Sequence, residues 1–132
     1  SVSAFLLNRS SDLRFKRLNN EATTYLKLND FENAIVCFNE SLNALNNDYA
    51  YFGKGLCEYE LNLPGACESL GSAVRLKKAQ LLEKGLILNE IGCYSQALET
   101  FEFLLKNHFK EDEMYIKASS GREFAMDKLD LN

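Results

Sequence analysis

One spacing, present twice in the chain, constrains the fold more than any other feature. In each copy a small residue is followed twelve positions later by alanine and four positions after that by phenylalanine: Ala22, Ala34 and Phe38, then Gly85, Ala97 and Phe101. Gly85 lies within a helical pattern, where glycine costs roughly 1 kcal/mol relative to alanine. We therefore expect another helix to pass too close to Gly85 for a side chain. Each copy is predicted to form a helix, a tight turn and a second helix.

This spacing resembles that of the tetratricopeptide repeat, a helix–turn–helix unit of about 34 residues. The positions that match the family pattern are Leu18, Ala22, Tyr25, Ala34 and Phe38 in one copy, and Leu81, Gly85, Leu88, Ala97 and Phe101 in the other. A degenerate copy between them has the skeleton Gly55, Ala66, Leu70 and Ala73, with Pro64 expected at the start of its second helix. The closing proline of the family pattern is absent. The resemblance implies an all-α fold, a right-handed α–α superhelix in which three repeats form a solenoid and a C-terminal helix caps it.

The 132 residues suit a single domain, which we expect to span residues 1–132. Its expected parts are an N-terminal segment (1–14), repeat 1 (15–46), repeat 2 (47–77), repeat 3 (78–110) and a capping helix (111–132). The helices are expected at residues 12–28, 31–45, 48–62, 64–76, 79–91, 94–107 and 111–131. Asp30 is expected to cap the second helix. Arg75, Lys77 and Lys78 are expected to end the fourth, where cations suit the helix dipole.

The two ends of the chain carry different signals. In the last predicted helix, small side chains recur on one face, at Met114, Ala118, Gly121 and Ala125, and this face is expected to dock on the third repeat. Near the N-terminus, residues 2–7 are mostly apolar, and no basic segment precedes them, so a signal peptide is not expected. They are compatible with the end of a preceding helix in a longer protein.

Composition and charge argue against several classes of partner. The net charge of −4 argues against a nucleic-acid backbone, and no apolar run approaches the roughly 18 residues that a membrane span needs. The cysteines, Cys37, Cys57, Cys67 and Cys93, form no C-x-x-C pair and have no histidine near them in the sequence. We therefore expect neither a metal nor another cofactor. Free thiols that pack as small apolar residues fit a reducing compartment, so a cytoplasmic location is predicted.

Catalytic residues are not evident in this sequence. The single histidine, His108, lies at the end of a predicted helix and is expected to be either a solvated residue or a C-terminal helix residue. No Ser/His/Asp or Cys/His arrangement can be assembled around it. We therefore expect that the protein is not an enzyme.

The family resemblance also implies a concave groove lined by the first helices of successive repeats. The residues expected to face it are Asn19, Thr23, Leu26, Tyr51, Tyr59, Leu82, Leu86 and Asn89. Amides can bond the backbone of a bound peptide, and aromatic rings can hold its side chains. We therefore expect a protein–protein interaction module, whether adaptor, scaffold or chaperone-like, that binds a peptide segment of a partner. For Tyr51, Leu82 and Leu86, ordinary packing is an equal alternative.

Other functions within the same resemblance stay open. Co-chaperones of this family hold the C-terminal carboxylate of heat-shock proteins with a clamp of Lys, Asn, Asn, Lys and Arg. The corresponding places here hold Asn19, Thr23, Phe52, Ala79 and Glu83, so that partner is not expected. Residues 48–57 are loosely similar to the middle repeat of chaperones for type III secretion translocators. The alternative function is a structural module that self-assembles into homo-oligomers, or a fragment of a larger repeat scaffold.

Overall fold

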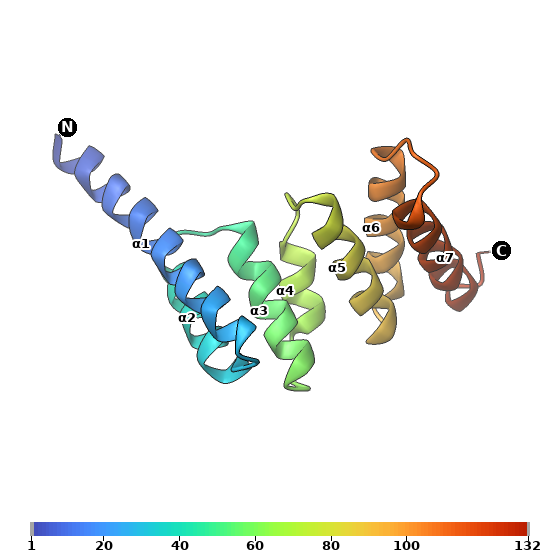
Figure 1. Ribbon diagram of the computed structural model, residues 1–132, viewed down its shortest axis with the longest axis horizontal. Coiled ribbons are helices and arrows are strands. Elements are labelled where there is room, and N and C mark those ends of the chain that lie inside the picture. Colours follow the sequence, from blue (N-terminus) through green and yellow to red (C-terminus); the bar gives the residue numbers. More distant parts are fainter. Residues whose placement is uncertain (1, 132) are drawn as a thin grey trace. The chain divides into compact units, whose positions relative to one another are not determined.

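The computed structural model describes the backbone of residues 2–131 and the side chains of residues 13–131. The apolar side chains expected near the N-terminus lie outside that description. The described chain is all-α and divides into two compact units, Ser1–Val74 and Arg75–Asn132. The first unit contains α1 (Val2–Lys27), α2 (Phe31–Ala44), α3 (Asp48–Glu60) and α4 (Ala66–Ser72), and the second contains α5 (Lys78–Glu90), α6 (Tyr94–Lys106) and α7 (Glu113–Lys128) (Figure 1).

In the first unit, consecutive helices pack as antiparallel pairs, α1 with α2 and α3 with α4, and α2 also packs against α3 (Figure 1). Phe38 of α2 is fully buried in the core with Ala22 of α1 and Ala50 of α3. A Cβ atom on Gly53 of α3 would lie 2.1 Å from the Phe38 ring. The packing of α3 on α2 therefore depends on the missing side chain of this glycine.

In the second unit, α5 and α6 form an antiparallel pair, and α7 packs against both. Phe101 of α6 is fully buried between two glycines. A Cβ atom added to Gly85 of α5 would lie 2.7 Å from the Phe101 ring, and one added to Gly121 of α7 would lie 2.4 Å from it. The close approach expected at Gly85 is thereby confirmed. The small face of α7 also docks as expected, since Ala118, Gly121 and Ala125 are buried, and Met114 of the same face is half-buried.

The helices α1, α3, α5 and α7 all end in the same hydrogen-bonded turn. A residue with a left-handed backbone follows each helix: Asn29 (φ 56°), Asn62 (φ 55°), Gly92 (φ 88°) and Asp130 (φ 56°). The N–H of the next residue donates to the carbonyl five positions earlier, from Asp30 to Tyr25 (2.9 Å), Leu63 to Glu58 (2.8 Å), Cys93 to Leu88 (2.8 Å) and Leu131 to Met126 (2.9 Å). This pattern satisfies carbonyl groups that a helix end leaves unpaired. Helix α7 therefore ends in the same turn as α1, α3 and α5, which are the first helices of the three pairs.

The residue seven positions before this turn distinguishes α7 from the other three helices. It is Ala22 in α1, Gly55 in α3 and Gly85 in α5, but Glu123 in α7. A Cβ atom on Gly55 would lie 2.6 Å from the Leu70 side chain of α4, just as Gly85 faces Phe101 of α6. Glu123 is exposed. Helix α7 therefore presents a charged side chain where the others meet their second helix.

Five of the seven expected helices agree with the structure to within three residues at each end, whereas α1 and α4 differ by more. Helix α1 is continuous from Val2, whereas its start was expected near residue 12. Helix α4 begins at Ala66 rather than at residue 64. Pro64 lies in the preceding turn, and Gly65, with a φ of 100°, is the N-cap. The expected position of Pro64 at the start of the helix is therefore wrong. The turn before α4 needs a residue with a left-handed backbone, and that residue is Gly65, so the helix begins only after it.

The predicted caps have mixed outcomes. Asp30 caps α2 as expected, accepting from the N–H of Asn33 at 3.2 Å. The expected dipole role of Arg75, Lys77 and Lys78 is wrong, because α4 already ends at Ser72. Lys77 instead precedes α5, where its N–H donates to Oε1 of Gln80 at 3.0 Å.

The cysteines differ in their redox state. Cys37 and Cys57 are free and buried. Burial, with a smaller contribution from Glu58 and Glu60, raises the pKa of the Cys57 thiol to about 12, so this thiol stays protonated. Neither Cys67 nor Cys93 is a free thiol, so the expectation of four free thiols is wrong for these two. Sequence spacing does not reveal the redox state of a thiol, and the argument for a cytoplasmic location loses that premise.

None of the helices formed by residues 2–131 is both long enough and apolar enough to cross a membrane.

Candidate functional site

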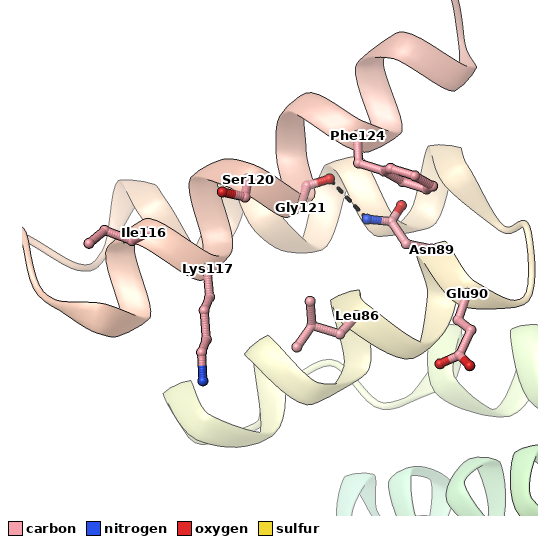
Figure 2. A pocket seen from close by; sticks show the side chains of 8 residues that line it. All are labelled: Leu86, Asn89, Glu90, Ile116, Lys117, Ser120, Gly121 and Phe124. Atoms are coloured by element: carbon pink, nitrogen blue, oxygen red, sulfur yellow. Dashed lines mark hydrogen bonds between the residues drawn. The ribbon is translucent and has the colours of Figure 1, made fainter.

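A cleft of about 440 Å³ lies between α5 and α7 in the second unit. It is lined by Leu86, Asn89 and Glu90 of α5 and by Ile116, Lys117, Ser120, Gly121 and Phe124 of α7 (Figure 2). Three of these side chains are large, apolar and exposed, namely Leu86 (43%), Ile116 (62%) and Phe124 (46%). Exposed apolar side chains that converge on one cavity are typical of binding sites.

Beside the cleft, α5 and α7 are joined by a hydrogen bond at a small residue, Gly121. Gly121 lets α7 approach Phe101 of α6, and Nδ2 of Asn89 on α5 donates to the Gly121 carbonyl at 2.9 Å. Ile116 and Phe124 lie on either side of this contact along α7 (Figure 2). Together with Leu86 of α5, they line a space between the helices that is open to solvent.

Asn89 contributes a buried acceptor to this site. The residue is 8% exposed, and its Oδ1 has no hydrogen-bond partner among the described residues. A buried polar atom without a partner costs about 1–3 kcal/mol. A donor that reached this oxygen would therefore be bound favourably.

Charged and aromatic groups define the ends of the cleft. Lys117 and Glu90 stand at opposite ends (Figure 2). Nζ of Lys117 is 2.9 Å from Oε1 of Glu113, and both side chains are exposed. The Phe124 ring meets Tyr94 edge-on at 6.1 Å between centroids, and Nζ of Lys128 is 5.4 Å from the Phe124 centroid. These two contacts position the aromatic ring at one end of the cleft.

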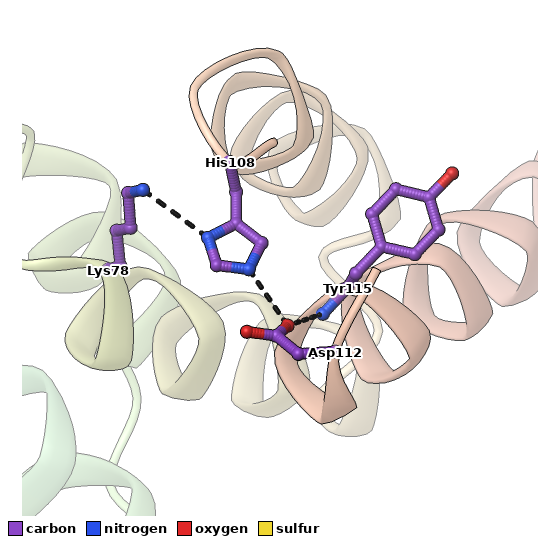
Figure 3. Close-up of polar contacts among 4 residues, drawn as sticks. All are labelled: Lys78, His108, Asp112 and Tyr115. Atoms are coloured by element: carbon purple, nitrogen blue, oxygen red, sulfur yellow. Dashed lines mark hydrogen bonds and ion pairs between the residues drawn. The ribbon is translucent and has the colours of Figure 1, made fainter. Parts of the chain in front are cut away.

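His108 links the N-terminal ends of α5 and α7 (Figure 3). Its Nδ1 is 3.3 Å from Nζ of Lys78, and its Nε2 is 2.8 Å from Oδ1 of Asp112. Because an ammonium group only donates, Nδ1 accepts and Nε2–H donates to the carboxylate. The His108 side chain is 10% exposed, so it is not solvated. It directly follows the C-cap of α6, Asn107, which agrees with the other alternative, a residue at the C-terminal end of a helix.

Asp112 caps α7 and holds it in this network. Its Oδ1 accepts from the N–H of Tyr115 at 3.0 Å. The hydrogen bond to His108, followed by the backbone hydrogen bond from Tyr115, lowers the pKa of the Asp112 carboxyl. The two contacts together hold the N-terminus of α7 against His108.

Acid should weaken the fold through Asp112. A carboxyl with a lowered pKa stabilises the folded state above its unfolded pKa of about 3.9, and the contribution is lost as the pH falls through the lower folded pKa. Asp112→Asn retains a good cap without the charge. We expect wild type to exceed this variant in urea-unfolding free energy at neutral pH, and the difference to vanish near pH 2. An equal difference at both pH values would show that the charge contributes nothing.

The predicted groove residues of the second unit are partly brought together. Leu86 and Asn89 both line the cleft, whereas Leu82 is half-buried on α5 and does not. One N–H of the Asn89 amide already donates to α7, whereas its oxygen has no partner among the described residues.

The predicted residues of the first unit have structural contacts of their own. Nδ2 of Asn19, a 7% exposed residue, donates to Oδ1 of Asn47, which caps α3. The Thr23 hydroxyl donates to the Asn19 carbonyl at 2.8 Å and is 2.7 Å from the Tyr49 hydroxyl. Leu26 packs against the core, and Tyr51 and Tyr59 are half-buried.

The α7 side of the cleft was missed in the sequence. Ile116, Ser120 and Phe124 recur every four positions and thus share one face of the helix. This spacing could have identified a second face of α7, but the sequence analysis considered only the face formed by its small residues.

Comparison with known proteins adds no assignment. Neither the models of known protein families nor the curated proteins include a match to this sequence. Among the described residues, no group of three or more His, Cys, Asp or Glu side chains is placed to hold a metal ion.

Proposed function

We propose that this protein is a non-catalytic interaction module of the tetratricopeptide-repeat type, and that the α5–α7 cleft holds a peptide segment of a partner protein. The observation that carries the proposal is the convergence of exposed Leu86, Ile116 and Phe124 on one cavity. Its volume of about 440 Å³ lies within the range of roughly 300–1,000 Å³ that is usual for ligand sites.

Two recurring features support the assignment to a helical repeat. The first is the turn that ends α1, α3, α5 and α7, in which the same backbone hydrogen bond runs to the carbonyl five positions earlier. The second is the pairing of a second-helix phenylalanine with a glycine of the next helix, Phe38 with Gly53 and Phe101 with Gly121. Repeat units bury their apolar faces against their neighbours, and such recurring contacts follow from that.

The chemistry of the cleft favours binding over catalysis. Its centre is apolar, and the ionisable side chains among its lining residues, Glu90 and Lys117, stand at opposite ends (Figure 2). No hydrogen bond or ion pair joins them among the contacts of the described residues, and the cleft holds no third ionisable group between them. Apolar side chains of a partner would anchor in the centre, as hot-spot residues do in protein interfaces.

Phe124→Asp should abolish peptide binding. We would select peptides of about 16 residues, roughly four helical turns, from a random phage-displayed library on the full chain. Peptides selected on wild type should bind the variant at least about tenfold more weakly, a loss of about 1.4 kcal/mol, because a charge replaces an aromatic anchor. The matched control is Phe103→Asp, at a residue 55% exposed on α6 and outside the cleft. A selection that yields no pool sensitive to Phe124 contradicts the proposal.

The same variant decides whether the partner is a second copy of the chain. Sedimentation at increasing concentration would reveal self-association. Association that disappears in Phe124→Asp and persists in Phe103→Asp would support the alternative function, a self-assembling module.

A further inference from the structure

We infer that the segment held in the cleft is an amphipathic helix that lies antiparallel to α5 and α7, with an acidic residue near its C-terminal end in contact with Lys117. This inference rests on the proposed function and specifies the partner of the same site. It follows from the length of the cleft, the direction of its two walls and the charges at its ends.

The length of the apolar lining matches a helix. Ile116 and Phe124 are eight positions apart on α7, which corresponds to about 12 Å of helix axis. Anchors at positions i, i+3 or i+4, and i+7 of a bound helix span about the same distance, roughly two turns. A helix can direct all of these anchors to one side, whereas an extended peptide turns alternate side chains away.

The direction follows from the orientation of the walls. Residues 86 to 90 of α5 and residues 116 to 124 of α7 run the same way along the cleft (Figure 2). Both helices therefore end near Glu90 and Phe124, and their dipoles place partial negative charge there. A bound helix is favoured with its own positive N-terminus at that end. Its C-terminus then lies at the Lys117 end.

The charged side chains strengthen this polarity. Glu90, the last residue of α5, adds negative charge at the end that receives the N-terminus of the bound helix. Lys117 adds a cation at the other end. Its pairing with Glu113 is an exposed contact between residues four apart, which contributes little and can be exchanged. Lys128 opposes Glu90 but lies over the Phe124 ring, so the Lys117 end provides the sharper test.

The test compares the peptide pools selected on three baits, wild type, Lys117→Glu and the control Lys110→Glu, which alters an exposed charge outside the cleft. Wild type should enrich apolar residues at i, i+3 or i+4, and i+7, followed by Asp or Glu toward the C-terminus. On Lys117→Glu that acid should change to Lys or Arg, while Lys110→Glu should retain it. A wild-type peptide should lose about tenfold in affinity on Lys117→Glu. Changing its acid to lysine should restore the affinity.

The outcomes separate this inference from the proposed function. A pool that depends on Phe124 but keeps its acid on Lys117→Glu overturns the contact with Lys117 and leaves peptide binding intact. An acid at the N-terminal end overturns the antiparallel direction. Selected peptides with proline between the anchor positions overturn the helical conformation, because proline breaks a helix in its interior. A failure to obtain any pool sensitive to Phe124 overturns the proposed function itself.

Discussion

Replacing Phe101 by alanine should destabilise the second unit by about 3–5 kcal/mol. The ring is fully buried, and it is enclosed by Gly85 of α5 and Gly121 of α7. Neither glycine has a side chain that could move into the space left behind. The cavity should therefore persist, and its cost adds to the lost transfer free energy of the ring. The α5–α7 cleft should be lost with it, since both walls rest on this residue.

Phe103→Ala is the matched control for this prediction. It removes the same ring from the same helix, but at a residue that is 55% exposed. Its effect should stay within about 0.5 kcal/mol, as for most surface substitutions. Urea unfolding of the full chain, followed by far-UV circular dichroism, measures both variants. Equal losses for Phe101→Ala and Phe103→Ala would mean that Phe101 does not form the core of α5, α6 and α7.

Gly121→Leu should have the second-largest effect, a loss of about 1–3 kcal/mol or more from overpacking. A Cβ atom alone would lie 2.4 Å from the Phe101 ring, so α7 must move away. The movement would also stretch the hydrogen bond from Asn89 to the Gly121 carbonyl. We therefore expect this variant to lose peptide binding as well as stability.

Glu123→Leu is the control on the same helix, because Glu123 is exposed. Leucine has a good helix propensity, so little change is expected there. Combining Gly121→Leu with Phe101→Ala gives a further check. The added side chain can enter the space of the removed ring, so the double variant should be more stable than the sum of the two losses predicts. Strict additivity would show that the two residues do not share one packing site.

The roles of some residues can be predicted from the sequence alone. Gly85 indicated a close helix crossing because glycine inside a helix is unfavourable unless something requires it. Asp30 indicated a helix start because its side chain can satisfy a backbone N–H. The small residues of α7 indicated a docking face, and Gly121 occupies its centre. In each case the reason is local and is contained in a few neighbouring residues.

The side-chain amides of two asparagines show where prediction from sequence fails. Asn19 and Asn89 were both expected to face a peptide, yet each donates to another helix or its cap, Asn19 to Asn47 and Asn89 to Gly121. An amide suits a groove and a buried interhelical contact equally well. Only the positions of the partner atoms distinguish the two roles.

The sequence by itself determined the helices, their short turns and the glycines at which they cross, since periodicity, capping and backbone freedom act over a few residues. Only the tertiary structure decided that α5 and α7 leave a cleft open beside Gly121, and that Ile116 and Phe124 line it. A stripe of apolar residues on a helix looks the same whether a neighbour covers it or not. Its exposure depends on where the linker around His108 places α7, and that placement depends on contacts with Lys78, thirty positions away in the chain.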